Sequence, residues 1–174
     1  MSSVKKNIVL IGMPGCGKTT IGRKLAKKIG VKFYDSDNYI EVTTGKSIPE
    51  IFQNGEDSFR QLETETIRKL AQETPCVIST GGGVVKKVEN IEALKENGII
   101  IFINRPIENI VKNINIKKRP LLKDKKETLY KLYDERIDLY KRYCDYEITN
   151  NSSIYSAVNK IEFIINSNRK EIGM

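Results

Sequence analysis

The sequence predicts one α/β domain in which helices cover both faces of a parallel β-sheet. Short apolar segments of strand type alternate with helical segments along the 174 residues, and this alternation is typical of parallel strands joined by helical crossovers. A glycine-rich turn joins the first strand to the first helix. No repeat, linker or low-complexity segment divides the chain, so residues 1–174 are expected to fold as a single domain.

The glycine-rich turn covers residues 12–19. The apolar run at 7–11 before it is of strand type, and the segment after it has apolar residues at helical spacing up to Ile29, with Gly30 as a C-cap glycine. The turn reads Gly-Met-Pro-Gly-Cys-Gly-Lys-Thr and fits the G-x-x-x-x-G-K-[ST] phosphate-binding loop. It therefore predicts a nucleoside triphosphate site, and the alternative is a chance glycine-rich turn.

A second strand at 32–34 leads into an Asp-Ser-Asp segment, and helices follow that segment. The first of these helices is expected to end at Thr44, before another C-cap glycine. A short helix starts at the capping box that begins with Ser47. A longer helix, at 56–73, has one apolar face and is expected to pack on the core.

The remaining predicted elements continue the alternation. Strands are predicted at 76–79, 99–103 and 146–148, and helices at 88–96, from Pro106, around 129–136 and at 154–165. The run at 99–103 is the most apolar in the chain and is expected to be a central strand. The stretch 112–126 is basic and lacks clear periodicity until its end, so we expect a mobile loop there.

The functional site is expected at the carboxyl ends of the strands. Three polar segments directly follow predicted strands: the glycine-rich turn, the Asp-Ser-Asp segment and three consecutive glycines at 81–83. In the turn, Lys18 is expected to reach the β- and γ-phosphates and the hydroxyl of Thr19 to bind Mg²⁺. These segments should therefore share one rim of the sheet.

The Asp-Ser-Asp segment is expected to supply a carboxylate for the metal. In many phosphate-loop proteins an acid ends a later strand, but the segment 79–83 contains none. Asp35 or Asp37 is therefore expected to take that place, because Mg²⁺ prefers oxygen ligands. Alternation on an extended segment would point both in similar directions, so that one serves the metal and the other an acceptor hydroxyl. An ordinary turn or N-cap is the alternative.

Glycines and arginines indicate further anion-binding groups. Three glycines at a strand end allow close backbone approach and offer N–H donors, although a flexible connector is the alternative. Arg60, Arg119 and Arg136 lie in separate predicted elements, and each alone resembles a surface arginine. Because arginine recognises carboxylates in a planar, bidentate manner, an acceptor substrate with a carboxylate would use such residues.

Composition and charge narrow the function classes. No apolar run of about 18 residues is present to span a membrane. The first residues lead straight into a strand, so we expect no signal peptide and a cytoplasmic location. The net charge of +8 is spread along the chain, and no nucleic-acid-binding signature accompanies it. Histidine is absent, so any acid–base step must fall to a carboxylate, a lysine or water.

The three cysteines, Cys16, Cys76 and Cys144, are widely spaced and odd in number. They form neither a metal-binding pattern nor a disulfide framework, which suits a reducing compartment. Cys16 lies near a predicted helix N-terminus, where a thiol can become more acidic. The simpler interpretation is a small residue tolerated in the turn.

Taken in order, these motifs resemble those of shikimate kinase over nearly the whole chain. The matching segments are 12–20, 33–37, 59–60, 81–83, 119–122, and Arg136 followed by 139–140. The phosphate-binding loop is shared by many kinases, whereas the ordered set is much more specific. This chain departs from the family's usual Arg-x-Pro-Leu-Tyr, because Asp138 replaces the proline, and Thr19 replaces the usual serine.

The resemblance implies a fold and an activity. The fold would be a single-domain P-loop kinase, with a five-stranded parallel sheet flanked by helices as in nucleoside monophosphate kinases. A mobile lid would lie at about 112–126 and a substrate-binding helical region at about 35–62. The enzyme would transfer the ATP γ-phosphoryl group to the 3-hydroxyl of shikimate, in chorismate and aromatic amino acid biosynthesis. One Mg²⁺ ion would assist, and the chain would be a monomer without nucleic-acid or membrane partners.

The resemblance also implies roles for individual residues. The ATP-binding residues would be Gly15, Cys16, Gly17, Lys18, Thr19, Thr20 and Arg119. The shikimate-binding residues would be Asp37, Arg60, Gly81, Gly82, Gly83 and Arg136. Asp37, Lys18 and the lid residue Arg119 would be catalytic, and Thr19 would bind the metal with Asp35 acting through its water shell.

Two other hypotheses remain open at this point. Another small-molecule P-loop kinase, such as a gluconate or nucleoside monophosphate kinase, would share the loop and the sheet but would not need arginines for a carboxylate. A nucleotide-binding regulatory or RNA-associated protein would account for the positive charge, which is +8. Substrate profiling separates the first, and RNA binding at different salt concentrations separates the second.

Overall fold

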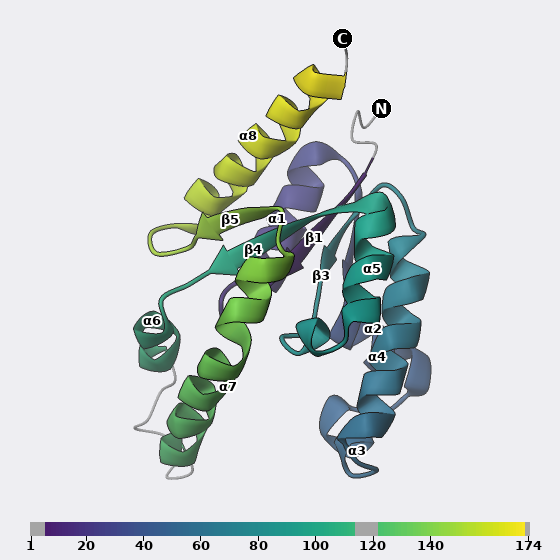
Figure 1. Cartoon of the computed structure of the whole chain (residues 1–174), viewed down its shortest axis with the longest axis vertical. Helices are drawn as coiled ribbons and strands as arrows, with labels where there is room; N and C mark the ends of the chain where they lie inside the picture. The colour runs from purple at the N-terminus through teal and green to yellow at the C-terminus, as the bar shows by residue number, and fades with distance from the viewer. Residues whose placement is uncertain (1–5, 114–121, 173–174) are drawn as a thin grey trace.

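The structure, a computed structural model of the chain, describes residues 6–113 and 122–172. Within these ranges, a parallel sheet of five strands has the order β2-β3-β1-β4-β5 (Figure 1). The strands are β1 (Asn7–Ile11), β2 (Lys32–Asp35), β3 (Cys76–Ser79), β4 (Gly98–Asn104) and β5 (Tyr146–Thr149). The α/β fold with a five-stranded parallel sheet is thus confirmed.

Helices connect the strands and cover both faces of the sheet. They are α1 (Lys18–Ile29), α2 (Ser36–Thr44), α3 (Ile48–Phe52), α4 (Glu56–Ala71), the 3₁₀ turn η1 (Val84–Lys86), α5 (Val88–Asn97), α6 (Ile107–Lys112), α7 (Leu122–Tyr143) and α8 (Ile154–Ile172). Helices α1 and α8 pack together on one face, and α4 and α5 pack together on the other (Figure 1). None of the helices in the described part of the chain is long and apolar enough to cross a membrane.

The core lies where the two helical layers meet the middle strands. Every residue of β1 is buried, because the strand has neighbours on both sides and helices on both faces. It pairs with β4 from Asn7 opposite Gly98 to Ile11 opposite Phe102. The continuous apolar runs of these strands reflect burial on both faces, as parallel sheets require.

Local signals set several helix ends as predicted. Gly30 and Gly45 adopt the left-handed conformation at the C-caps of α1 and α2, which a residue without Cβ does at little cost. Ser47 and Glu50 form the predicted capping box of α3, with the Ser47 N–H donating to Glu50 Oε2 at 2.7 Å. Gly30 thus ends α1 before β2, and Gly45 and the capping box set the turns between β2 and α4.

The prediction of a loop at 112–126 is wrong at both ends of that range. Lys112 is the last residue of α6, and residues 122–126 belong to the first turns of α7. The positions between, 114–121, lie outside the described residues. The periodicity was missing because the start of α7 extends beyond the sheet (Figure 1), where good helix formers such as lysine and glutamate need no apolar face.

Candidate active site

The turn after β1 has the backbone of a phosphate-binding loop. Its glycines Gly12, Gly15 and Gly17 have φ angles of 147°, 79° and 103°, where an L side chain is strained. A Cβ on Gly12 would also lie 2.7 Å from the carbonyl oxygen of Ile103. Gly17 is the N-cap of α1 and offers no side-chain hydrogen bond, so the first N–H groups of the helix stay available to an anion.

Lys18 holds the loop together from within. The side chain is 7% exposed, and its ammonium donates to the carbonyl oxygens of Gly12 at 2.8 Å and Met13 at 2.9 Å. It also lies 3.6 Å from the sulfur of Cys16, which is fully buried. The thiol therefore fills space inside the loop, in agreement with the simpler interpretation of this cysteine. A positive charge is already in place where a triphosphate would bind.

Thr19 and Asp35 form an oxygen pair beside the loop. The Thr19 hydroxyl donates to Asp35 Oδ2 at 2.7 Å, and it lies 3.4 Å from the hydroxyl of Ser79. Asp35 is also the N-cap of α2, because its Oδ1 accepts from the N–H of Asn38 at 3.1 Å. The N-cap interpretation of Asp35 is therefore confirmed, and its metal-binding role stays a prediction, for which the Thr19 and Asp35 oxygens are of the kind that suits Mg²⁺.

Asp37 lies in the first turn of α2 and not on an extended segment, so strand alternation is not what brings it near Asp35. Its Oδ1 atom is buried and has no hydrogen-bond partner among the described residues. Burial raises the pKa of the Asp37 carboxyl above its ordinary value of 3.8, and the charge of Asp35 raises it further. Lys18 and Arg60 oppose that rise through their positive charges. A buried carboxylate oxygen without a hydrogen-bond partner is costly unless a ligand supplies one.

The three glycines after β3 form a fixed segment rather than a flexible connector. The N–H of Gly81 donates to the hydroxyl of Ser36 at 3.1 Å, and the N–H of Thr80 donates to the carbonyl oxygen of Leu10 at 3.1 Å. The carbonyl of Gly81 in turn accepts from Val84 N–H at 3.2 Å. The segment is therefore tied to β1, to α2 and to the η1 turn.

Each of these glycines leaves room for a side chain from another element. A Cβ would lie 2.8 Å from Asp37 Oδ1 if placed on Gly81, 2.9 Å from Pro14 Cδ if placed on Gly82, and against the guanidinium of Arg60 if placed on Gly83. Real Cβ atoms do not approach other atoms so closely, so any larger residue would displace these groups. The absence of side chains here brings charged groups against the backbone.

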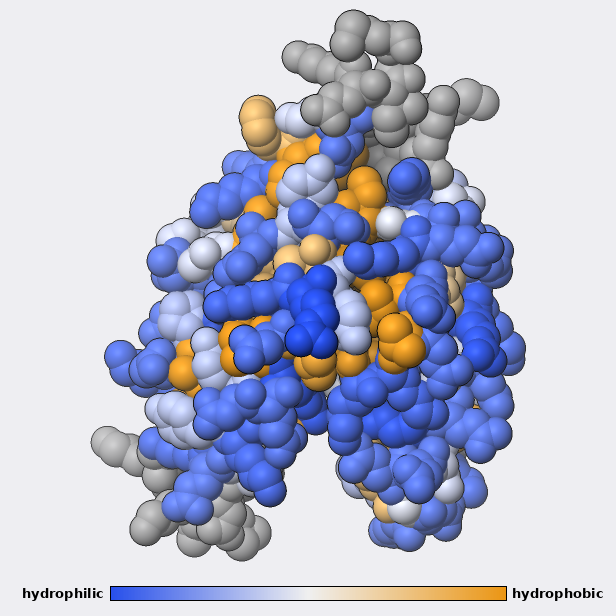
Figure 2. Space-filling model, in the orientation of Figure 1, coloured by the Kyte–Doolittle hydropathy of each residue, from blue (hydrophilic) through white to orange (hydrophobic). Residues whose placement is uncertain are grey.

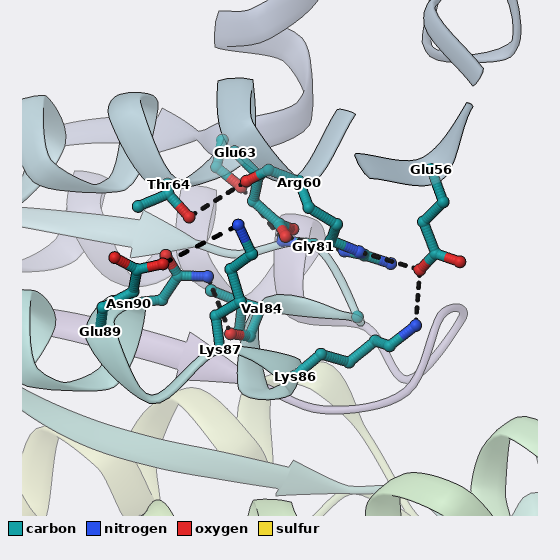
Figure 3. A network of polar contacts seen from close by, with 12 residues as sticks. Glu56, Arg60, Glu63, Thr64, Gly81, Val84, Lys86, Lys87, Glu89 and Asn90 are labelled. Carbon is teal, nitrogen blue, oxygen red and sulfur yellow. Dashed lines mark hydrogen bonds and ion pairs between the residues drawn. The ribbon is translucent and has the colours of Figure 1, made fainter. Parts of the chain in front are cut away.

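Arg60 is fixed by two carboxylates of its own helix. Its Nη1 donates to Glu63 Oε2 at 2.7 Å and its Nε to Glu56 Oε1 at 3.1 Å, and Lys86 also pairs with Glu56 (Figure 3). Glu63 is fully buried, and burial raises the pKa of its carboxyl despite the opposing charge of Arg60. Its Oε1 has no hydrogen-bond partner within the described ranges.

Arg136, on α7, also lies beside the three glycines. The residue is 8% exposed, and its Nε is buried without a partner in the part of the chain that the structure describes. Its Nη1 lies 3.3 Å from where a Cβ on Gly82 would be. A residue distant in sequence from Arg60 and Asp37 thus faces the same three glycines.

A cleft opens beyond the carboxyl edge of the sheet. Figure 2 shows the surface hollowed between the lobe that contains α7 and the lobe that contains α3 and α4, both largely hydrophilic. Arg60 comes from the α4 side and Arg136 from the α7 side. The arrangement can therefore bind a small anion with hydroxyl groups between two arginines and one carboxylate.

The structure brings together most of the residues predicted for the site. The loop residues, Asp35, Asp37, Arg60, the three glycines and Arg136 all lie at the carboxyl edge of the sheet. Thr20 is exposed in the first turn of α1. The predicted residue Arg119 lies outside the described residues.

Sequence reasoning missed Glu63, Glu56 and Asn150. Glu63 and Glu56 lie three and four residues from Arg60 on α4, so helical spacing to an arginine could have found them. Asn150 follows β5 and is 7% exposed, and its amide donates to the carbonyl oxygen of Cys16 at 2.8 Å. No sequence pattern links Asn150 to a loop at the other end of the chain.

We expect Asn150→Asp to weaken ATP binding. The carboxylate would face the carbonyl oxygen of Cys16, so a buried hydrogen bond would become a repulsion costing about 1–3 kcal/mol. The KM for ATP should rise roughly tenfold and the melting temperature should fall, as measured by steady-state kinetics and thermal unfolding. Asn54→Asp, at an exposed position, is the matched control. An unchanged KM for ATP would show that the phosphate-binding loop does not need this bond.

Shikimate kinases are among the known proteins that this chain resembles in sequence and in structure. Residues 14–165 match the family model described as shikimate kinase. The chain is 50% identical to a shikimate kinase of Clostridium botulinum (strain Eklund 17B / Type B), over 95% of this chain and 100% of that protein. It is 49% identical to one of Clostridium beijerinckii, over 95% and 98%. A solved shikimate kinase from Acinetobacter baumannii, in complex with shikimate, is similar with a TM-score of 0.86 and 37% identity, over 96% of both chains.

Proposed function

This chain belongs to the shikimate kinase family and is an ATP-dependent kinase that phosphorylates shikimate; on that premise, we propose how its residues share the reaction. The observation that carries the proposal is the convergence of Asp37, Arg60 and Arg136 on the three glycines, next to the phosphate-binding loop. Asp37 would bind the hydroxyl that reacts, and Arg60 and Arg136 would bind a carboxylate of the acceptor.

On the donor side, the loop and the start of α1 bind the triphosphate. Lys18 exchanges its contacts with Gly12 and Met13 for the β- and γ-phosphates, and the N–H groups of α1 add further donors. Thr19 and Asp35, whose Oγ1 and Oδ2 atoms are 2.7 Å apart, would hold one Mg²⁺, with Asp35 acting through water. When bound, the ion supplies charge neutralisation at the phosphates.

On the acceptor side, the two arginines fix the carboxylate of shikimate. Arg60 keeps its Nη2 for the substrate, because Nε and Nη1 are engaged by Glu56 and Glu63. Arg136 binds the same carboxylate from the other wall of the cleft. Two guanidinium groups from opposite lobes would hold the ring in one orientation, which is worth much of the rate in a reaction that depends on positioning.

Asp37 then accepts a hydrogen bond from the 3-hydroxyl of shikimate. The hydroxyl oxygen bonds to the γ-phosphorus, the bond from that phosphorus to the bridging oxygen breaks, and ADP leaves. The hydroxyl proton passes to Asp37, whose raised pKa makes it a better proton acceptor than an exposed carboxylate. The products are shikimate 3-phosphate and ADP.

Other parts of the prediction stay proposals. Residues 112–126 would form the lid and 35–62 the substrate-binding helical region, and Arg119 would stabilise charge on the transferred group. A lid would exclude the water that otherwise hydrolyses ATP. We also propose a cytoplasmic monomer without nucleic-acid or membrane partners. A gluconate or nucleoside monophosphate kinase is not favoured, since family membership and the paired arginines support a carboxylate acceptor.

Shikimate-dependent release of ADP tests the proposal. With ATP and Mg²⁺ present, a coupled spectroscopic assay should show rapid ADP formation when shikimate is added and only slow hydrolysis when it is omitted. Gluconate and nucleoside monophosphates serve as alternative acceptors and should give the slow rate. ADP release that ignores shikimate but follows one of these acceptors would overturn the acceptor assignment.

A further inference from the structure

Tyr140 is a buried residue of α7 that the proposed reaction does not use. It is fully buried, and its ring stacks on Phe102 of β4 with centroids 5.2 Å apart and an interplanar angle of 21°. The stacking anchors the helix to the sheet one turn after Arg136. A phenylalanine would serve that packing equally well.

The hydroxyl of Tyr140 contacts both halves of the proposed site. It donates to the carbonyl oxygen of Gly82 at 2.6 Å, and it lies 3.9 Å from the sulfur of Met13 in the phosphate-binding loop. One phenol oxygen therefore lies between the segment that faces the acceptor and the loop that holds the donor.

The hydrogen bond from Tyr140 to Gly82 is short and lies in a buried place. Burial raises the pKa of the Tyr140 hydroxyl, so the group keeps its proton and remains a donor over the physiological pH range. The ring of Pro14 and the guanidinium of Arg136 lie beside the place that a Cβ on Gly82 would take. The Gly82 carbonyl is thus bonded to Tyr140, while its neighbour Gly81 is bonded to Ser36 and Val84.

We propose that Tyr140 is a positioning residue that fixes the three glycines relative to the phosphate-binding loop and so sets the affinity for the acceptor. It acts through the carbonyl of Gly82 and through the placement of Arg136, without touching a substrate. The inference rests on the proposed binding of the acceptor at residues 81–83. If the hydroxyl is lost, the donor loop keeps Lys18 and the start of α1, so ATP binding should be spared.

Tyr140→Phe tests the proposal, because it removes the hydroxyl and keeps the ring. After shikimate-dependent ADP release has been established for the unaltered enzyme, steady-state kinetics should give a KM for shikimate about tenfold higher, as one lost buried hydrogen bond predicts. The KM for ATP should stay within about twofold. Tyr143→Phe, on the same helix and half-buried, is the control and should leave both constants unchanged.

A double-mutant cycle with Arg136→Met separates positioning from general destabilisation. If Tyr140 acts through Arg136 and Gly82, the two losses in kcat/KM for shikimate should not add, and the double variant should lose less than the product of the single effects. Equal rises in both KM values, or fully multiplicative losses, would overturn the proposal. Absence of shikimate phosphorylation by the unaltered enzyme would instead contradict the proposed function.

Discussion

Asp37→Asn should lower kcat by about 10²–10⁴-fold, the range expected when a general base is removed. The amide keeps the shape of the side chain and can still contact the acceptor, but it cannot take the hydroxyl proton. ATP binding should persist, because the contacts of Lys18 and Thr19 within the donor loop remain in place. Steady-state kinetics with shikimate, together with calorimetric titration of ATP, measure the two effects separately.

The same substitution should stabilise the fold at neutral pH. Since the pKa of folded Asp37 is raised above 3.8, protonation is favoured by folding. The carboxyl therefore contributes stability below its unfolded pKa, and that contribution is lost as the pH rises through the folded pKa. Asp37→Asn removes the unfavourable half-buried charge, so its melting temperature should exceed that of the unaltered protein at pH 7. The difference between the two melting temperatures should narrow toward pH 4.

The activity of the unaltered enzyme should rise with pH as Asp37 ionises, whereas the stability that Asp37 contributes falls. Only the ionised form of Asp37 accepts a proton, so kcat/KM should fall on the acidic side with a midpoint above pH 3.8. Asp37→Asn should lose this acidic limb. Glu41→Gln, which removes a nearby acid from the same helix, is the control and should keep it. Near-normal turnover in Asp37→Asn would show that this residue only orients the hydroxyl or has no role.

Local patterns predicted the parts of the fold that depend on local physics. The phosphate-binding loop, the C-cap glycines Gly30 and Gly45 and the capping box at Ser47 each act within a few residues, so their signals are present in a short stretch of sequence. The alternation of strands and helices predicted a parallel sheet in the same way. The order of the strands has no such local signal.

The features of the site that local patterns did not predict depend on contacts between residues far apart in the sequence. A glutamate on a helix usually faces solvent, yet Glu63 is fully buried. Its carboxylate can approach the backbone of Gly81 because Gly81 lacks a Cβ. Asn150 contacts a loop more than a hundred residues away, as the separation of 134 from Cys16 shows. Asp37 was placed near Asp35 for the wrong reason, since a helix start rather than a strand directs its side chain.

Arg136→Met should raise the KM for shikimate roughly a hundredfold while leaving the KM for ATP within about twofold. Methionine fills similar space without the guanidinium, and losing one partner of a buried charge pair costs about 2–5 kcal/mol, or more than a tenfold change in affinity. Arg136 is a better choice than Arg60, because loss of Arg60 would leave the buried Glu63 unpaired and confuse binding with folding. Steady-state kinetics with each substrate varied in turn measure the effect.

Discrimination between shikimate and its uncharged methyl ester shows whether the lost affinity belongs to the carboxylate. The unaltered enzyme should prefer shikimate strongly, and Arg136→Met should lose most of that preference, because the ester never gains from the guanidinium. Arg142→Met, on the exposed side of the same helix, should keep both the preference and the KM. If Arg136→Met weakened shikimate and the ester equally, Arg136 would be shaping the cleft and not binding the carboxylate. The argument for a carboxylate acceptor would then rest on Arg60 alone.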